Sequence, residues 1–215
     1  MLPEAYILAF DTSAAHCAAA LLRGDQLILS RLEPMEKGQA ERLMGLLDEM
    51  LAEAGIGWCD LAAVAVGTGP GNFTGVRIAV AAARGLALGL GVPAIGVTRF
   101  DAIALDLPRP IAVVEDARRD EVYVQGFGAD AVAARLCGLA DLPGLIGAVP
   151  VVGSVAVAAA GLTGAGVHEA RYPLAEAIAR VGLDRLGTEH PRPAPFYLRA
   201  ADAAPSSEPP LVILP

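Results

Sequence analysis

The chain has 215 residues, of which 54% are hydrophobic and 19% are charged. Soluble domains carry about 25% charged residues, so this composition excludes a largely disordered chain and suggests that a partner covers part of the surface. The 16 Lys and Arg residues oppose 24 Asp and Glu residues, which gives a formal net charge of −8. That balance excludes a protein that binds nucleic acid by itself through a basic surface.

The cysteines and the apolar stretches bear on the compartment. Three widely spaced cysteines form no Cys-x-x-Cys pair, which argues against a disulfide framework and a structural zinc site and favours a cytoplasmic location. The apolar stretch 78–97 contains Arg84 and Pro93, and the uncharged stretch 145–167 is broken by a proline and several glycines. We therefore interpret both as buried elements of an α/β protein and expect no membrane association.

The first half of the chain alternates short apolar runs with turn residues and helical repeats. Leu43, Leu47 and Met50 recur at helical spacing between polar residues, and Gly55 follows as a helix terminator. In chain order we predict strands at 6–10, 17–22 and 26–31, a helix at 40–54, a strand at 61–66, a helix at 74–90 and a strand at 94–97.

The second half resembles the first, because a short strand again ends in acidic residues and returns through a polar turn. The apolar segment 195–199 is expected to dock back on the protein, whereas 203–210 has the composition of a loose tail. We predict, for a smaller second lobe, strands at 111–114, 122–127 and 149–152, helices at 131–139 and 174–186, and a short helix between 152 and 174.

A glycine-rich segment, Gly67 to Arg77, lies between a predicted strand and a predicted helix, where phosphate cradles are built. It lacks the Lys-Ser/Thr pair of a P-loop, departs from the Gly-x-Gly-x-x-Gly register, and loses a backbone N–H donor at Pro70. Two interpretations stay open. The glycines either serve a ligand or only allow a sharp turn and close helix packing.

Charged residues at element ends are the next candidates. Arg77 falls in the first turn of its helix, where the helix dipole disfavours a cation by about 0.3 to 1 kcal/mol. We expect an acidic partner for it, either Asp11 of this chain or an anionic ligand or partner. Asp11, Thr12 and Ser13 follow the first strand, and Asp116 follows the strand at 111–114. Such residues could hold a metal-nucleotide, but their role as turn formers is favoured.

No catalytic group stands out in the sequence. The three histidines have no partner at helical spacing, the Gly-x-Ser-x-Gly elbow does not occur, and no cysteine and histidine are arranged as a nucleophile and its base. The sequence therefore predicts neither a catalytic residue nor a metal site.

Six segments, in order along the chain, resemble the TsaB (YeaZ) family: 7–13, 39–43, 69–78, 85–87, 116–123 and 197–199. The most specific motif consists of Gly69, Pro70, Gly71, Asn72, Phe73, Thr74, Gly75, Val76 and Arg77. The resemblance implies an α/β, actin-like ATPase fold of the sugar kinase and Hsp70 class, with two similar lobes of mixed sheets flanked by helices. We place the first lobe at 1–107, the smaller lobe at 108–202 and a Pro-rich tail at 203–215.

The resemblance also implies a function. Members of this family help to make threonylcarbamoyladenosine in tRNA as non-catalytic partners of the related catalytic subunit TsaD, joined by the ATPase TsaE. It follows that ATP and a metal belong to partner subunits, that tRNA is reached only through the complex, and that Asp11, Thr12, Ser13 and Asp116 are degenerate positions of a nucleotide cleft. The paralogue's metal-binding histidine pair is matched here by Arg99 and Ile103.

We expect the partner surface on the two first-lobe helices, because the segment 78–90 is apolar on nearly every side. The candidate contact residues, for TsaD or for a second copy of the chain, are Leu43, Leu47, Met50, Ala79, Ala82, Ala83 and Leu86. The alternative is that the sheet and the helix at 40–54 cover these apolar sides within the chain.

Two functions from different classes compete. One is an accessory subunit of a tRNA-modifying complex, and the other is a small-molecule kinase or a metalloprotease-like enzyme of the same fold. A kinase needs phosphate loops and a positioned carboxylate, and a metalloprotease needs metal ligands. Because the sequence shows neither set in full, the accessory function is favoured.

Overall fold

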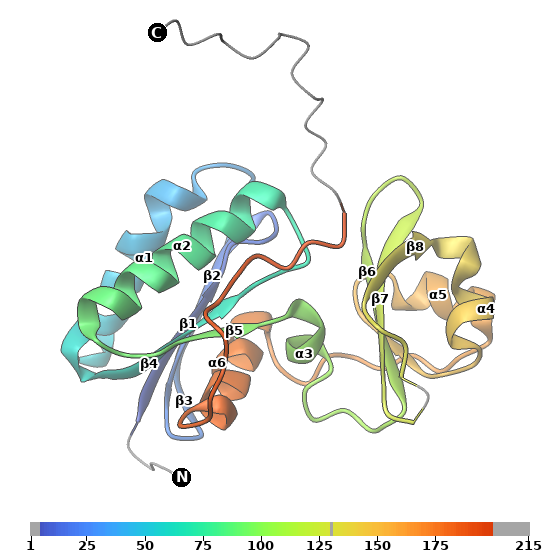
Figure 1. The fold of residues 1–215 in the computed structure, drawn as a ribbon. Helices are drawn as coiled ribbons and strands as arrows, with labels where there is room; N and C mark the ends of the chain where they lie inside the picture. Colours follow the sequence, from blue (N-terminus) through green and yellow to red (C-terminus); the bar gives the residue numbers. More distant parts are fainter. Residues whose placement is uncertain (1–4, 130, 200–215) are drawn as a thin grey trace, which may run out of the picture.

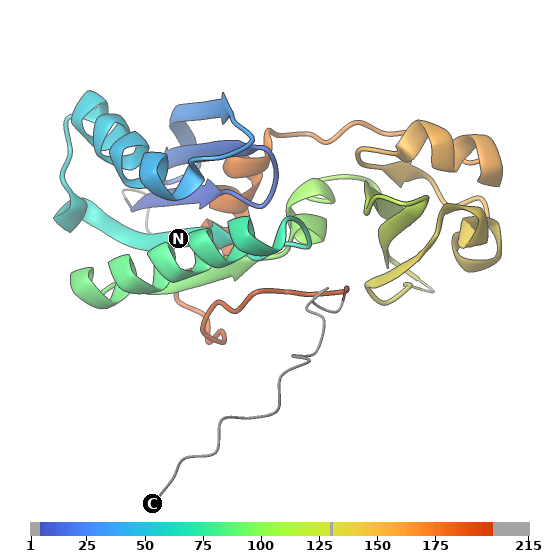
Figure 2. The same ribbon diagram turned by 90° about the horizontal axis from the view of Figure 1, so that it is seen from above.

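A five-stranded sheet and a four-stranded sheet organise the chain, and the computed structural model describes residues 5–129 and 131–199. Each sheet forms the centre of one lobe, and the lobes lie side by side with the short helix α3 (Arg99–Ile103) between them (Figures 1 and 2). The tail expected from residue 203 onward lies outside the described residues.

The first sheet has the order β3-β2-β1-β4-β5. Its first three strands form an antiparallel meander, while β1, β4 and β5 run parallel. Nearly every residue of β1, β2 and β4 is buried, which explains why the sequence shows continuous apolar runs rather than alternation. The strands are β1 (Tyr6–Asp11), β2 (His16–Arg23), β3 (Gln26–Pro34), β4 (Leu61–Gly67) and β5 (Ala94–Val97).

Helices cover both faces of this sheet (Figure 1). On one face, α1 (Gln39–Ala54) and α2 (Phe73–Leu90) enclose a core with Leu8, Phe10 and Val64, and a short 3-10 turn η1 (Trp58–Asp60) precedes β4. On the other face, α6 (Leu174–Arg185) packs on a core that includes Ile7 and Ala65. The helix is thus part of the first lobe although it follows the second lobe in the sequence.

The second sheet has the order β8-β7-β6-β9 and a single layer of short helices on one face. Its other face packs against α3 and the chain around Phe196 and Leu198. The elements are β6 (Ile111–Asp116), β7 (Glu121–Phe127), β8 (Arg135–Gly138), η2 (Leu139–Asp141), α4 (Leu142–Ile146), β9 (Val151–Val152) and α5 (Ala156–Thr163).

Two expectations about this half of the chain are wrong. The helix predicted at 131–139 is instead the edge strand β8, which pairs antiparallel with β7. Alanines favour a helix in this segment. Its backbone N–H and C=O groups instead find partners in the sheet, through the hydrogen bond from Gly126 to Val132 and through the pairing of β8 with β7. The helix predicted at 174–186 exists as α6, but it packs on the first sheet, so the second lobe ends before it rather than at residue 202.

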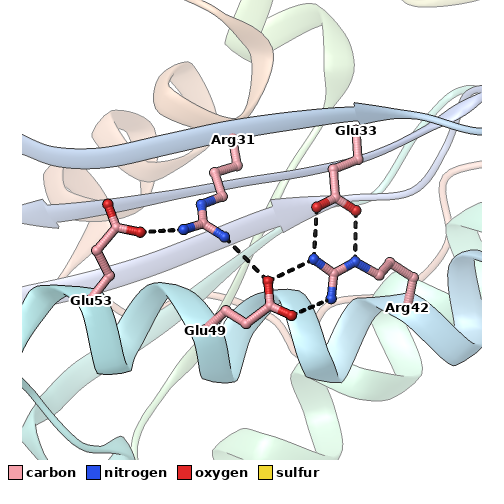
Figure 3. A network of polar contacts seen from close by, with 5 residues as sticks. All are labelled: Arg31, Glu33, Arg42, Glu49 and Glu53. Carbon is pink, nitrogen blue, oxygen red and sulfur yellow. Dashed lines mark hydrogen bonds and ion pairs between the residues drawn. The ribbon is translucent and has the colours of Figure 1, made fainter.

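A network of exposed ion pairs connects the edge strand β3 to α1 (Figure 3). Arg42 donates to both Glu33 and Glu49, with N to O distances of 2.7 Å, and Arg31 bridges Glu49 and Glu53. Because Arg31 and Glu33 lie on β3 and the other members on α1, the network holds the helix along the sheet edge.

Among the described residues, α2 is the one helix long and apolar enough to cross a bilayer by length and composition. It carries Arg77 and Arg84, and it packs against β4 and α1. These contacts are those of a core helix in an α/β layer.

Candidate functional site

A cleft of about 950 Å³ lies between the lobes. Segments far apart in the sequence line it, and they include the turn after β1, the glycine-rich loop before α2, the end of β6 with its turn, and the chain at 196–199. These segments carry most of the motifs that the sequence singled out, so the fold brings those motifs to one place.

The glycine-rich loop packs directly on the turn after β1. The Asn72 amide donates to the Ser13 carbonyl at 2.6 Å, and the Thr12 hydroxyl donates to the Gly75 carbonyl at 2.7 Å. A Cβ at Gly71 would overlap the Ser13 carbonyl oxygen, and one at Gly75 would overlap that of Thr12. Close packing therefore accounts for these two glycines without a ligand.

Asn72 also begins α2. Its side-chain oxygen accepts the Gly75 amide at 3.0 Å, which satisfies one of the free N–H groups at the start of the helix. The pair formed by Asn72 and Gly75 fixes the direction in which α2 leaves the loop.

The expectation that Asp11 pairs with Arg77 is wrong. The Arg77 guanidinium lies 3.8 Å from the Phe73 ring centroid, and its Nε donates to the Tyr197 hydroxyl at 2.9 Å. The rings of Phe73 and Tyr197 stack with their centroids 4.8 Å apart. A cation–π contact and a neutral acceptor from the far end of the chain thus take the place of the expected carboxylate.

Asp11 is engaged by other groups. Its Oδ1 accepts the Ser13 amide at 2.9 Å and the Ser13 hydroxyl at 2.8 Å, and it lies 2.8 Å from His16 Nε2. Burial alone would raise the pKa of Asp11, but the His16 hydrogen bond and the positive charge of Arg99 lower it further than burial raises it. Asp11 is therefore held as a carboxylate in the interior.

The sequence pointed to Arg99 only as a replaced metal-ligand position and did not predict the ion pair that it forms in the cleft. Its Nε lies 2.5 Å from Glu115 Oε2, and its backbone N–H donates to Gly69. Glu115 is 5% exposed and accepts the Ser154 amide through Oε1 at 2.6 Å. A sequence signal existed, because Glu115 is a charge placed directly at the end of the fully apolar run 111–114.

Asp116, one residue further along, is exposed and forms a turn. Its Oδ1 accepts the Arg118 amide at 2.9 Å, and its own amide donates to the Ser154 hydroxyl. The favoured interpretation of Asp11 and Asp116 as turn formers agrees with these bonds, since each carboxylate accepts the amide two residues further on.

The segment before residue 200 docks back on the protein, as predicted. The Phe196 amide donates to the Thr68 carbonyl at 2.8 Å, and its ring meets Phe100 edge to face. Arg199 then reaches the second lobe, where it donates to the Ala117 carbonyl at 2.8 Å and to Glu121 at 2.6 Å. The segment therefore contacts both walls of the cleft.

These residues do not fit a metal-nucleotide. Asp11 Oδ1 already accepts three groups, Oδ2 lies against the backbone of Gly67, and the carboxylate of Glu115 is paired with Arg99. The Arg99 guanidinium, which pairs with Glu115, also repels a divalent cation. Over residues 5–129 and 131–199, no group of three or more His, Cys, Asp or Glu side chains could hold a metal ion.

Five of the seven residues expected to contact a partner are buried inside this chain. Leu43, Leu47, Met50, Ala79 and Ala83 are at most 1% exposed, because α1 and α2 pack on the sheet and on each other. The prediction that these five residues contact a partner is therefore wrong, because they belong to the core of the first lobe. Ala82 and Leu86 are half-buried and remain available for a contact.

Comparison with solved structures identifies the class of fold. The activator of the 2-hydroxyisocaproyl-CoA dehydratase from Clostridium difficile with bound ADPNP matches with a TM-score of 0.53 and 10% identity, over 84% of this chain and 95% of that chain. Two lobes of mixed sheets flanked by helices, with a cleft between them, define an actin-like ATPase fold.

Comparison of sequences identifies the family. The family model described as TsaD: tRNA N6-adenosine threonylcarbamoyltransferase matches residues 33–140. The tRNA threonylcarbamoyladenosine biosynthesis protein TsaB of Haemophilus influenzae is 37% identical over 123 residues, which are 54% of this chain and 51% of that protein. A Pseudomonas aeruginosa protein with similarity to peptidase YeaZ matches with a TM-score of 0.72 and 26% identity, over 91% of this chain and 100% of that chain.

The chain belongs to the TsaB/YeaZ family, whose named members act in the biosynthesis of threonylcarbamoyladenosine in tRNA. It spans about half the length of the curated relatives it matches.

Proposed function

We propose that this chain is a non-catalytic subunit that binds TsaD and, together with TsaE, supports threonylcarbamoyl transfer to adenosine in tRNA. Family membership and the match of the TsaD family model to half of the chain support this assignment. The observation that carries it is an exposed apolar patch on the outer face of α2.

The apolar patch consists of Ala81, Gly85 and Leu88, with the half-buried Ala82 and Leu86 beside them. The exposed Arg77 and Arg84 lie on the same side of the helix. Leu88 is 83% exposed, more than any other large hydrophobic side chain in the part of the chain that the structure describes. Small residues at Ala81 and Gly85 let a second helix approach closely, and Leu88 supplies apolar area for it to bury. A helix of TsaD, or the same helix of a second copy of this chain, fits such a face.

The proposal assigns chemistry to the partners. ATP and a metal belong to TsaD and TsaE, this chain has no cofactor of its own, and tRNA is reached through the complex because the net charge of −8 disfavours binding to phosphates. A cytoplasmic location follows from a role in tRNA modification.

The test compares two charged substitutions at equally exposed apolar sites. Leu88→Glu should abolish copurification with TsaD and the stimulation of threonylcarbamoyl transfer, because a buried carboxylate without a partner is costly. Val157→Glu, on α5 of the second lobe and 78% exposed in the native chain, is the matched control and should leave both unchanged. Circular dichroism verifies that both variants fold.

Two results would overturn the proposal. Copurification and stimulation that persist in a folded Leu88→Glu variant would place the contact elsewhere. Transfer activity by this chain in the absence of TsaD would contradict the non-catalytic role.

A further inference from the structure

We propose that Arg99 is a built-in cation that takes the place of a bound ligand between the lobes, so that the cleft is a fixed junction rather than a ligand-driven hinge. The inference concerns the shape of this chain alone and is independent of any partner.

The argument begins with how firmly Arg99 is held. Its residue starts α3, the helix between the lobes, and its backbone N–H donates to the Gly69 carbonyl at 2.8 Å. Thr98 caps the same helix by accepting the Asp101 amide. The side chain therefore projects into the cleft from a fixed backbone, attached to the glycine-rich loop of the first lobe.

The guanidinium then forms an ion pair with a carboxylate of the other lobe. Glu115 ends β6 of the second lobe and pairs with Arg99 Nε at 2.5 Å, while Asp11 ends β1 of the first lobe and interacts with the same charge electrostatically. Both carboxylates are at most 5% exposed. Opening the cleft would separate Glu115 from Arg99, which stays with the first lobe, and would leave a buried carboxylate without its cation, which is a strongly unfavourable state.

The glutamate is fixed in turn. Glu115 Oε1 accepts the Ser154 amide at 2.6 Å, so the carboxylate is oriented by the loop after β9. The junction thus connects the glycine-rich loop, Arg99, Glu115 and the Ser154 loop in one continuous series of contacts.

A second arginine, Arg199, connects the two lobes at the rim of the cleft. Arg199 belongs to the segment that the Phe196 amide and the Tyr197 ring attach to the first lobe, and it donates to Ala117 and Glu121 of the second lobe. Two independent arginine contacts, one deep and one at the rim, restrain rotation of one lobe against the other.

The experiment measures the distance between the lobes with spin labels in the intact chain. One label is placed on Cys59, which is exposed in the first lobe, and one on Ala158→Cys, which is exposed on α5. Cys137→Ala removes the half-buried thiol, and Cys17 is buried. We expect one narrow distance distribution that magnesium-ATP does not shift.

Removing the built-in cation should loosen the junction. Arg99→Met combined with Arg199→Met should broaden the distribution roughly twofold, since both restraints on the open states are lost. If Arg99→Met does not fold, Arg99→Met with Glu115→Gln keeps the acceptor for the Ser154 amide and removes the unpaired charge. The matched control is Arg180→Met, which breaks an ion pair with Glu176 inside the first lobe and should leave the width unchanged.

Two outcomes would overturn the inference. One is a distribution as narrow as that of the native chain in the folded double arginine variant. The other is a distance in the native chain that changes when magnesium-ATP is added, because the cleft would then be a hinge that responds to a ligand.

Discussion

The first lobe buries its central strands on both faces, whereas β7 and β8 of the second lobe stay half-exposed. In the first lobe, α1 and α2 cover one face of the sheet and α6 covers the other. In the second lobe, α4 and α5 cover one face, and the other depends on α3 and the segment around Phe196, which are attached to the first lobe.

This difference teaches that the two lobes are not equivalent folding units. The first lobe completes its core with a helix that comes after the whole second lobe in the sequence, so the second lobe is an insertion between α3 and α6. Part of the core of the second lobe consists of contacts between its sheet and residues attached to the first lobe, such as Phe100 and Phe196. We therefore expect perturbations of the first lobe to cost more stability than equivalent perturbations of the second.

The largest expected effect is at the contact between the glycine-rich loop and the turn after β1. Gly75→Ala should destabilise the chain by about 3 kcal/mol or more, because its Cβ would overlap the Thr12 backbone, which has no free rotation to escape. Gly85→Ala, on the exposed side of the same helix with open space around it, is the control and should stabilise by about 0.5 to 1 kcal/mol. Urea unfolding measures both, and equal effects would contradict close packing at Gly75.

A smaller effect separates the cores of the two lobes. Leu47→Ala removes a fully buried side chain of α1 and should cost about 2 to 5 kcal/mol. Leu145→Ala removes a half-buried side chain of α4 and should cost roughly 1 to 2 kcal/mol, since less apolar area leaves water there. A cost at Leu145 equal to that at Leu47 would show that α4 contributes as much to the core of its lobe as α1 does to the core of the first lobe.

The smallest effect is the response to acid. The pKa of Asp11 is lowered in the folded chain, so its contribution to stability is complete above the unfolded value of 3.8 and is lost as the pH falls through the folded value. Asp11→Asn should therefore flatten the loss of stability below about pH 4. Hydrogen exchange or urea unfolding across this range measures the slope.

The control for this prediction uses salt. The exposed pairs of Glu33 and Glu49 with Arg42 are screened by salt, whereas buried Asp11 is screened much less. High salt should therefore leave the difference between the native chain and Asp11→Asn in place. A difference that disappears in high salt would assign the acid sensitivity to the surface network of Figure 3.

The sequence predictions were more accurate for the first lobe than for the second. The strands β1, β2 and β4 were predictable as continuous apolar runs because both of their faces are buried, whereas the mostly exposed β3 was predictable from the turn residues before it. Helix α1 was predictable from Leu43, Leu47 and Met50 at helical spacing. The edge strand β8 was not predictable, since its four half-exposed residues form no apolar run and the alanines just before it favour a helix. Only its pairing with β7 makes it a strand.

The sequence predicted which segments form the candidate site but not which side chains pair with one another there. The motifs named the turn after β1, the glycine-rich loop, the turn after β6 and the segment at 197–199, and these line one cleft. The partners of Arg77 and Arg99 depend on contacts across 120 and 16 positions, respectively, which periodicity does not report. For the same reason, the helical pattern predicted the residues of α6 correctly but did not show that the helix packs on the first lobe.

The ion pairs between β3 and α1 have a consequence for solubility. An edge strand presents unpaired N–H and C=O groups to which a strand of another chain can add. A strand of the length of β3, nine residues, would be a template for aggregation if it carried no charge. Here Arg31 and Glu33 are held within the network by Glu49, Glu53 and Arg42, so an incoming strand would have to desolvate fixed charges. A chain with 54% hydrophobic residues thus protects an exposed sheet edge with charge.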